Sequence, residues 1–189
     1  KMMTGLHGGD LTVLAARPGV GKTGLMVSIA RNVARPRDAD DIPGGVAIFS
    51  LEMPLEQISL GFGSGESGVD YNAIRELKLN RDQWQNLVDS TQTLSTMPIW
   101  IDPSPTLTVL ECRSQVRRLQ REIASGRMPV RCKKLVAVFI DYLQLMQGIR
   151  LPGANREQEI ASLSRGLKAM AKDLDVHVMA LAQLNRAPE

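Results

Sequence analysis

Short apolar runs alternate with longer segments of helical periodicity along the chain. Each run is apolar at every position rather than at every second one, which is typical of strands covered by helices on both faces of a sheet. The runs lie at residues 11–15, 46–50, 98–101, 136–140 and 176–181. This alternation of strand and helix predicts an α/β fold, with a mainly parallel sheet and helices on both of its faces.

Two segments carry clear helical signals. The first, 22–34, follows directly on a turn rich in glycine and proline. The second begins where Asn155 can cap a helix and Gln158 follows three residues later, the arrangement of a capping box. After it, apolar residues recur at spacings of three and four: Ile160, Leu163, Leu167, Met170 and Leu174. This spacing predicts a helix with one apolar face.

Two other stretches read as irregular. Residues 35–45 have the composition of a loop between the first helix and the second strand. Further on, Pro54 and Glu56 indicate the start of a helix, but Gly61, Gly63 and Gly65 follow within it. Residues 61–65 are therefore expected to be a glycine-rich break, where this helix is broken or rebuilt, and the sequence assigns them no role.

A phosphate-binding loop is the clearest motif. The segment Ala16-Arg17-Pro18-Gly19-Val20-Gly21-Lys22-Thr23 has its spacing and lies directly between a predicted strand and a predicted helix. In such a loop, backbone N–H groups and the helix N-terminus face the phosphates of a nucleotide. Lys22 would contact the β and γ phosphates, and the Thr23 hydroxyl would ligate Mg²⁺. Together with Gly24, these residues are the candidate ATP-binding residues, although Ala16 stands where the generic pattern has glycine.

Polar residues follow the ends of three predicted strands. Asp141 closes the fourth run and is placed to hold Mg²⁺ through water. Glu52 follows the second run, where it could orient or deprotonate a water that attacks the γ-phosphate; an acid at a helix N-terminus is the alternative, and spacing alone leaves both open. Gln183 follows the fifth run and could donate a hydrogen bond to the γ-phosphate, although a glutamine at a strand end indicates little by itself.

Composition and charge indicate less about function than these motifs do. A net charge of +3 and a pI of about 9.1 are only mildly basic, and no apolar run is long enough to cross a membrane. Arg113, Arg117 and Arg121 repeat every four residues and would form one stripe on a helix, where a solvated face, a subunit contact and a DNA contact all stay open. Cys112 and Cys132 lack metal-binding spacing, so we expect reduced thiols in a cytoplasmic protein.

Taken together, these segments resemble the C-terminal ATPase domain of the DnaB-type replicative DNA helicases, over nearly the whole chain. Alanine at the first position of the phosphate-binding loop is usual in that family. The resemblance rests on Thr4-Gly5-Leu6, Gly9-Asp10-Leu11, Ala15 to Thr23, Ser50-Leu51-Glu52-Met53, Asp141-Tyr142-Leu143-Gln144-Leu145-Met146, Asn155-Arg156-Glu157 with Glu159-Ile160, Ser164-Arg165 with Leu167-Lys168, and Gln183-Leu184-Asn185-Arg186.

The resemblance implies a P-loop NTPase with a RecA-like core, working as a homo-hexamer that moves along single-stranded DNA with ATP and Mg²⁺. It implies that Glu52 is the catalytic carboxylate, that Lys22, Thr23 and Asp141 hold phosphate and metal, and that Gln183 contacts the γ-phosphate. Primase and a helicase loader are the implied partners. Residues 1–189 are expected to form one motor domain, incomplete at both ends, with the arginine finger and the main DNA-binding loop beyond Glu189.

Two other functions remain open on this reasoning. A RecA-family ATPase of the RadA or KaiC kind would share the core but act in recombination or signalling. A helicase-derived adaptor would bind ATP without hydrolysing it. The motif that begins at Asp141 and the block 155–168 favour the helicase over a RadA-like or KaiC-like ATPase. Glu52 favours the helicase over a non-hydrolysing adaptor, which would not need this carboxylate.

Overall fold

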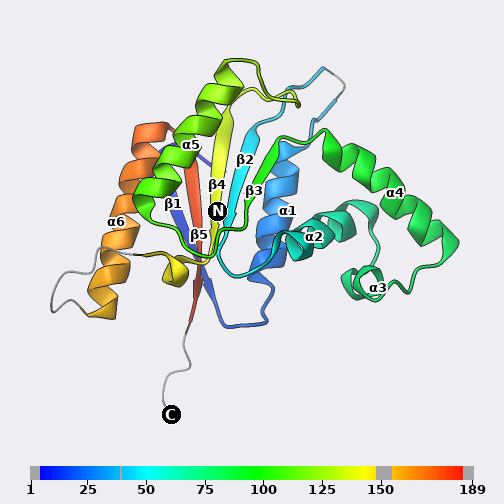
Figure 1. Ribbon diagram of the computed structural model, residues 1–189, viewed down its shortest axis with the longest axis horizontal. Helices are drawn as coiled ribbons and strands as arrows, with labels where there is room; N and C mark the ends of the chain where they lie inside the picture. Colours follow the sequence, from blue (N-terminus) through cyan, green and yellow to red (C-terminus); the bar gives the residue numbers. More distant parts are fainter. Residues whose placement is uncertain (1–4, 39, 148–154, 185–189) are drawn as a thin grey trace, which may run out of the picture.

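The computed structural model describes residues 5–38, 40–147 and 155–184. Its centre is a five-stranded parallel sheet with the strand order β1-β5-β4-β2-β3 (Figure 1). The strands are β1 (Leu11–Ala16), β2 (Gly45–Ser50), β3 (Ile99–Asp102), β4 (Leu135–Asp141) and β5 (His177–Gln183). The predicted α/β fold is therefore confirmed, and β5 continues two residues beyond the predicted run, to Gln183.

Helices cover both faces of the sheet, as Figure 1 shows. One face carries α1 and α2, with α3 and α4 beyond them, and the other carries α5 and α6. The helices are α1 (Lys22–Ala34), α2 (Leu55–Ser67), α3 (Tyr71–Arg75), α4 (Arg81–Ser95), α5 (Val109–Ala124) and α6 (Arg156–Leu174), with a 3-10 turn η1 (Leu143–Leu145) after β4. No helix in the described ranges is long and apolar enough to span a bilayer.

Alternate residues of the central strands bury their side chains on opposite faces of the sheet. In β4, Ala137 and Phe139 belong to the core beneath α1 and α2, whereas Val138 and Ile140 belong to the core beneath α5 and α6. All four are almost fully buried. This two-sided burial explains why the runs are apolar at every position.

The first turn of α6 has the predicted cap. The side chain of Asn155 accepts a hydrogen bond from the Gln158 amide at 2.9 Å, and the Gln158 side chain accepts one from the Asn155 amide at 3.2 Å. Two of the four amides left free at a helix start are thereby satisfied. Thr4, Asn185 and Arg186, which belong to the motifs quoted above, lie outside the described residues.

The break expected at 61–65 is wrong, because α2 runs without interruption through these glycines. A Cβ atom at Gly61 would lie 3.7 Å from Val27 of α1, and one at Gly65 would lie 2.9 Å from the guanidinium of Arg31. Gly65 therefore leaves room for the Arg31 side chain of α1, whereas Gly61 lies at an ordinary packing distance from Val27. This packing outweighs the intrinsic cost of helical glycine, about 1 kcal/mol for each residue.

Candidate functional site

The order of the strands brings the candidate residues to one edge of the sheet. Parallel strands end at the same edge, and here the order along it is β1, β5, β4 and β2. Ala16 at the end of β1 pairs with Gln183 at the end of β5, and Asp141 of β4 pairs with Ser50 of β2. The strand β5, which ends at Gln183, therefore lies between β1, which leads into the phosphate-binding loop, and β4, which ends at Asp141. Glu52 lies just beyond Ser50.

The phosphate-binding loop depends on glycine at two positions. Gly19 has a φ of 76° and Gly21 a φ of 94°, conformations that other residues rarely adopt. Gly21 is also the N-cap of α1, and in the described part of the chain no side chain caps the free amides there. A Cβ atom at Gly19, Gly21 or Gly24 would meet no atom of the described residues within 4 Å, so with respect to them this side of the loop is open. These features fit a phosphate group held by backbone amides.

The Lys22 side chain folds back over the loop that precedes it. Its ammonium group donates to the carbonyl of Ala16 at 3.0 Å and to that of Arg17 at 3.4 Å. The charge thus lies at the start of the loop, close to the end of β1. A phosphate bound to the loop would compete with these two carbonyls for the ammonium group.

Thr23 and Asp141 meet beside the loop. The Thr23 hydroxyl donates a hydrogen bond of 2.8 Å to the carboxylate of Asp141, whose residue surface is only 1% exposed. Burial raises the pKa of Asp141, while the bond from Thr23 and the charge of Lys22 act in the opposite direction. A hydroxyl and a carboxylate are ligands that Mg²⁺ prefers, so the two residues fit this metal.

Nothing in the described part of the chain forms a complete metal cage on its own, since it contains no group of three or more His, Cys, Asp or Glu placed to share an ion. Mg²⁺ usually keeps several waters and is shared between one or two protein ligands and the phosphates of a nucleotide. Thr23 and Asp141 provide two protein ligands, which is the number expected for such a shared site.

Glu52 lies in a tight turn that follows β2. The Ser50 hydroxyl holds this turn, because it donates to the Met53 carbonyl at 2.7 Å and accepts from the Met53 amide at 3.2 Å. Glu52 itself is exposed and precedes Pro54, the N-cap of α2, so the acid in the first turn of that helix is Glu56. The geometry thus argues against the reading of Glu52 as an acid at a helix N-terminus. Sequence reasoning missed the part played by Ser50.

Gln144 is a second residue that sequence reasoning missed. Its side-chain amide donates to the Gln183 carbonyl at 2.8 Å, and its side-chain oxygen accepts from the Gln183 amide at 3.2 Å. Gln144 lies in η1, and its signal in the sequence was its place in the motif from Asp141 to Met146, which indicated no contact with Gln183. The main chain at the end of β5 is therefore held from the side of β4.

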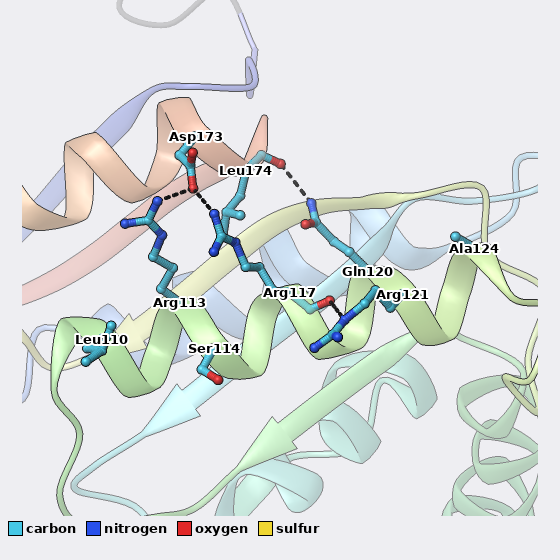
Figure 2. Close-up of a pocket in the computed structure, with 9 residues that line it drawn as sticks. All are labelled: Leu110, Arg113, Ser114, Arg117, Gln120, Arg121, Ala124, Asp173 and Leu174. Atoms are coloured by element: carbon cyan, nitrogen blue, oxygen red, sulfur yellow. Dashed lines mark hydrogen bonds and ion pairs between the residues drawn. The ribbon is translucent and has the colours of Figure 1, made fainter.

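The stripe of Arg113, Arg117 and Arg121 lies on α5, along a groove of about 800 Å³ between α5 and α6 (Figure 2). Arg113 and Arg117 both donate to the carboxylate of Asp173 on α6, and hydrogen bonding from Arg113 lowers the pKa of that carboxyl group. Arg121 donates to the Arg117 carbonyl within its own helix. Part of the stripe thus joins two helices, which the sequence alone did not indicate.

Comparison with known proteins gives a consistent picture. A family model described as "DnaB-like helicase C terminal domain" matches residues 1–189. "Replicative DNA helicase DnaB" of Geobacillus stearothermophilus is 38% identical over 189 residues, which are 100% of this chain and 38% of that protein. The chain therefore spans less than half the length of this relative.

Solved structures agree with the sequence comparison. One described as "The Structure Of A DnaB-Like Replicative Helicase And Its Interactions With Primase" superposes with a TM-score of 0.81 at 29% identity, over 96% of this chain and 40% of that one. A second solved structure, described as an ATPase domain, gives a TM-score of 0.78 at 30% identity, over 94% of this chain and 58% of that one.

Proposed function

The chain belongs to the family of DnaB-like helicase C-terminal domains, and from this premise we propose that it is the ATP-hydrolysing motor of a replicative helicase that moves on single-stranded DNA. The observation that carries the proposal is the contact between Thr23 and Asp141 beside an open phosphate-binding loop. This contact supports a metal site formed by Thr23 and Asp141 next to the place where a triphosphate would lie.

Residues 16–24 bind the triphosphate in this proposal. The free amides at the start of α1 face the phosphate oxygens, and the positive end of the helix dipole favours their charge. Lys22 exchanges its two carbonyl partners for the β and γ phosphates. Thr23 would ligate Mg²⁺, and Asp141 would hold it through water. A magnesium ion bound there would neutralise charge that develops on the phosphate oxygens during hydrolysis.

Glu52 acts on the attacking water. Its turn is fixed by Ser50 and joined to β4 by the bond from the Leu51 amide to the Asp141 carbonyl at 2.8 Å. The backbone on either side of Glu52 is therefore held next to the end of β4, and from this turn the carboxylate would orient a water molecule and accept its proton. A non-hydrolysing adaptor would not need a carboxylate on this turn.

Gln183 completes the row along the edge of the sheet. As a neutral amide at the end of β5, the strand between β1 and β4, it can donate a hydrogen bond to the γ-phosphate and lose it after hydrolysis. We propose that this change is the step that links ATP hydrolysis to movement on DNA. An arginine from a neighbouring subunit of a homo-hexamer would stabilise the charge on the transferred group.

Membership of the helicase family also supports proposals for the protein's partners and its place in the cell. One of the similar structures was solved as a DnaB-like helicase with its interactions with primase, and we propose primase as a partner of this protein too, with a helicase loader as another. We place the protein in the cytoplasm, where its free cysteines would stay reduced. A match of the helicase family model to the whole chain favours this function over a RadA-like or KaiC-like ATPase.

Steady-state ATP hydrolysis by the full-length protein tests the proposal. We expect the rate to rise severalfold when single-stranded DNA is added, and to rise far less with blunt duplex DNA of the same length. A Lys22→Ala variant should hydrolyse ATP poorly under both conditions. Equal rates with and without single-stranded DNA would refute the helicase function and favour a signalling ATPase.

A further inference from the structure

The side chain of Gln144 forms two hydrogen bonds with the main chain of one residue, Gln183. It donates to the carbonyl at 2.8 Å and accepts from the amide at 3.2 Å. A single bond would tether the end of β5, whereas this pair engages the peptide groups on both sides of the Gln183 Cα atom. The direction in which the Gln183 side chain leaves the backbone is therefore tied to the position of Gln144.

The main chain of Gln144 is bound in turn by α6. Arg156, the first residue of that helix, donates from its guanidinium to the Gln144 carbonyl and also pairs with Glu159 one turn later. Hydrogen bonds to a charged donor are stronger than neutral ones. A continuous path of direct contacts thus runs from Gln183 through Gln144 to the start of α6.

The rest of the segment around Gln144 is also fixed. Leu143 is buried in the core beneath α5 and α6, and the Gln147 amide donates to the Leu107 carbonyl at 2.9 Å, just before α5 begins. A change at Gln183 therefore meets a short, well-anchored segment rather than a free loop. Such a segment can transmit a shift of the main chain to α5 and α6, whose first residues lie next to its contacts.

We infer that Gln144 is a positioning residue that couples the γ-phosphate contact of Gln183 to the first turn of α6. The inference rests on the proposed function, because it gives Gln183 a nucleotide to contact. Gln144 itself does not touch the nucleotide in this scheme. It sets the orientation of Gln183 and passes a displacement of Gln183 to Arg156.

Kinetics of Gln144→Met in the full-length protein test the inference. Methionine keeps the length of the side chain but removes both hydrogen bonds. We expect kcat with saturating single-stranded DNA to fall about tenfold, while KM for ATP changes less than about twofold, because the phosphate-binding loop is untouched. Gln147→Met makes the same change at an exposed position of the same segment and should behave like the wild type.

A double-mutant cycle shows whether Gln144 acts through Gln183. If it does, Gln144→Met combined with Gln183→Ala should be no slower than Gln183→Ala alone, since the side-chain contact with the γ-phosphate that Gln144 positions is already lost. Additive losses would contradict the inference, as would a Gln144→Met enzyme with wild-type kcat. If the wild-type protein shows no stimulation by DNA, the proposed function fails first, and the two failures are thereby distinguished.

Hydrogen exchange on the unmodified protein covers the case in which Gln144→Met does not fold. Binding of a non-hydrolysable ATP analogue should slow amide exchange in a peptide that spans the first turn of α6, compared with ADP. The same exchange rate in that peptide with both nucleotides would overturn the inference. Slower exchange only in the phosphate-binding loop would overturn it as well.

Discussion

Thr23 and Asp141 are 118 residues apart in the sequence, yet the hydroxyl of one lies 2.8 Å from the carboxylate of the other. Asp141 is among the few polar residues that are buried in the core. Burial raises its pKa, so the fold places a carboxylate where its charge is unfavourable. Such an arrangement is typical of functional sites, because a bound cation would stabilise the charge that the protein alone does not.

Replacing Thr23 tests this interpretation. Thr23→Val keeps the shape of the side chain but removes the hydroxyl, and we expect the Mg²⁺ concentration for half-maximal ATP hydrolysis to rise about tenfold or more. A Mg²⁺ titration at fixed ATP measures it. Thr93→Val, on the exposed surface of α4, is the matched control. An unchanged Mg²⁺ requirement in Thr23→Val would remove this hydroxyl from the metal site.

Much of this site could be predicted from the sequence because it depends on local patterns. The phosphate-binding loop is one continuous segment between a strand and a helix, and the ends of parallel strands must meet at one edge. This was enough to bring Lys22, Asp141 and Gln183 to the same region. The cap of α6 at Asn155 was also predictable, since its partner lies three residues away.

The features that were missed depend on contacts between distant segments. Gln144 reaches Gln183 only because β4 and β5 are neighbours in the sheet. The glycines of α2 indicate a break when read alone, but their meaning comes from the side chains of α1 that pack against them. The pairing of Arg113 with Asp173 likewise needs α5 and α6 to lie side by side.

Two glycine substitutions should have opposite effects on stability. A Cβ atom at Gly61 would make ordinary contact with Val27 at 3.7 Å, so Gly61→Ala should raise the free energy of unfolding by about 0.5–1 kcal/mol. A Cβ atom at Gly45 would lie 2.7 Å from the sulfur of Cys132 and 2.8 Å from the Trp100 ring, so Gly45→Ala should lower it by about 1–3 kcal/mol. Urea denaturation of both variants measures the difference. A destabilised Gly61→Ala would contradict the packing described for α2.

Arg113 and Arg121 of the arginine stripe should differ in their contribution to thermal stability. Arg113→Glu places a second acid against Asp173 and should lower Tm, whereas Arg121→Glu should change Tm by only about 1–2 °C. The charge swap Arg113→Glu with Asp173→Arg should restore part of the loss. Equal Tm values for Arg113→Glu and Arg121→Glu would show that the contact with α6 contributes nothing.

The effect of Asp173 on stability should also depend on pH. Arg113 holds the pKa of this carboxyl group below its usual value, so the folded state favours the charged form. The stabilisation is present above the ordinary aspartate pKa of about 3.9 and is lost as the pH falls through the lowered pKa. The difference in Tm between wild type and Arg113→Glu should therefore shrink in acid.

The two cysteines should differ in reactivity. Burial raises the pKa of Cys112 to about 12, and its side chain is enclosed beneath α5. At pH 8 only about one thiol in ten thousand would be ionised. A thiol reagent should therefore modify the native protein at Cys132 alone, which is only half-buried, and Cys132→Ser should abolish that reaction. Rapid modification of Cys112 without denaturant would contradict the packing of this face.

The central claim is that ATP is hydrolysed at this edge of the sheet with Glu52 as the catalytic carboxylate, and Glu52→Gln tests it most directly. The change keeps the size of the side chain, and Glu56→Gln, on the first turn of α2, is the matched control. In the full-length protein with single-stranded DNA, Glu52→Gln should lower kcat by about a hundredfold or more while the Kd for ATP stays within about threefold. Turnover at the wild-type rate would contradict the account.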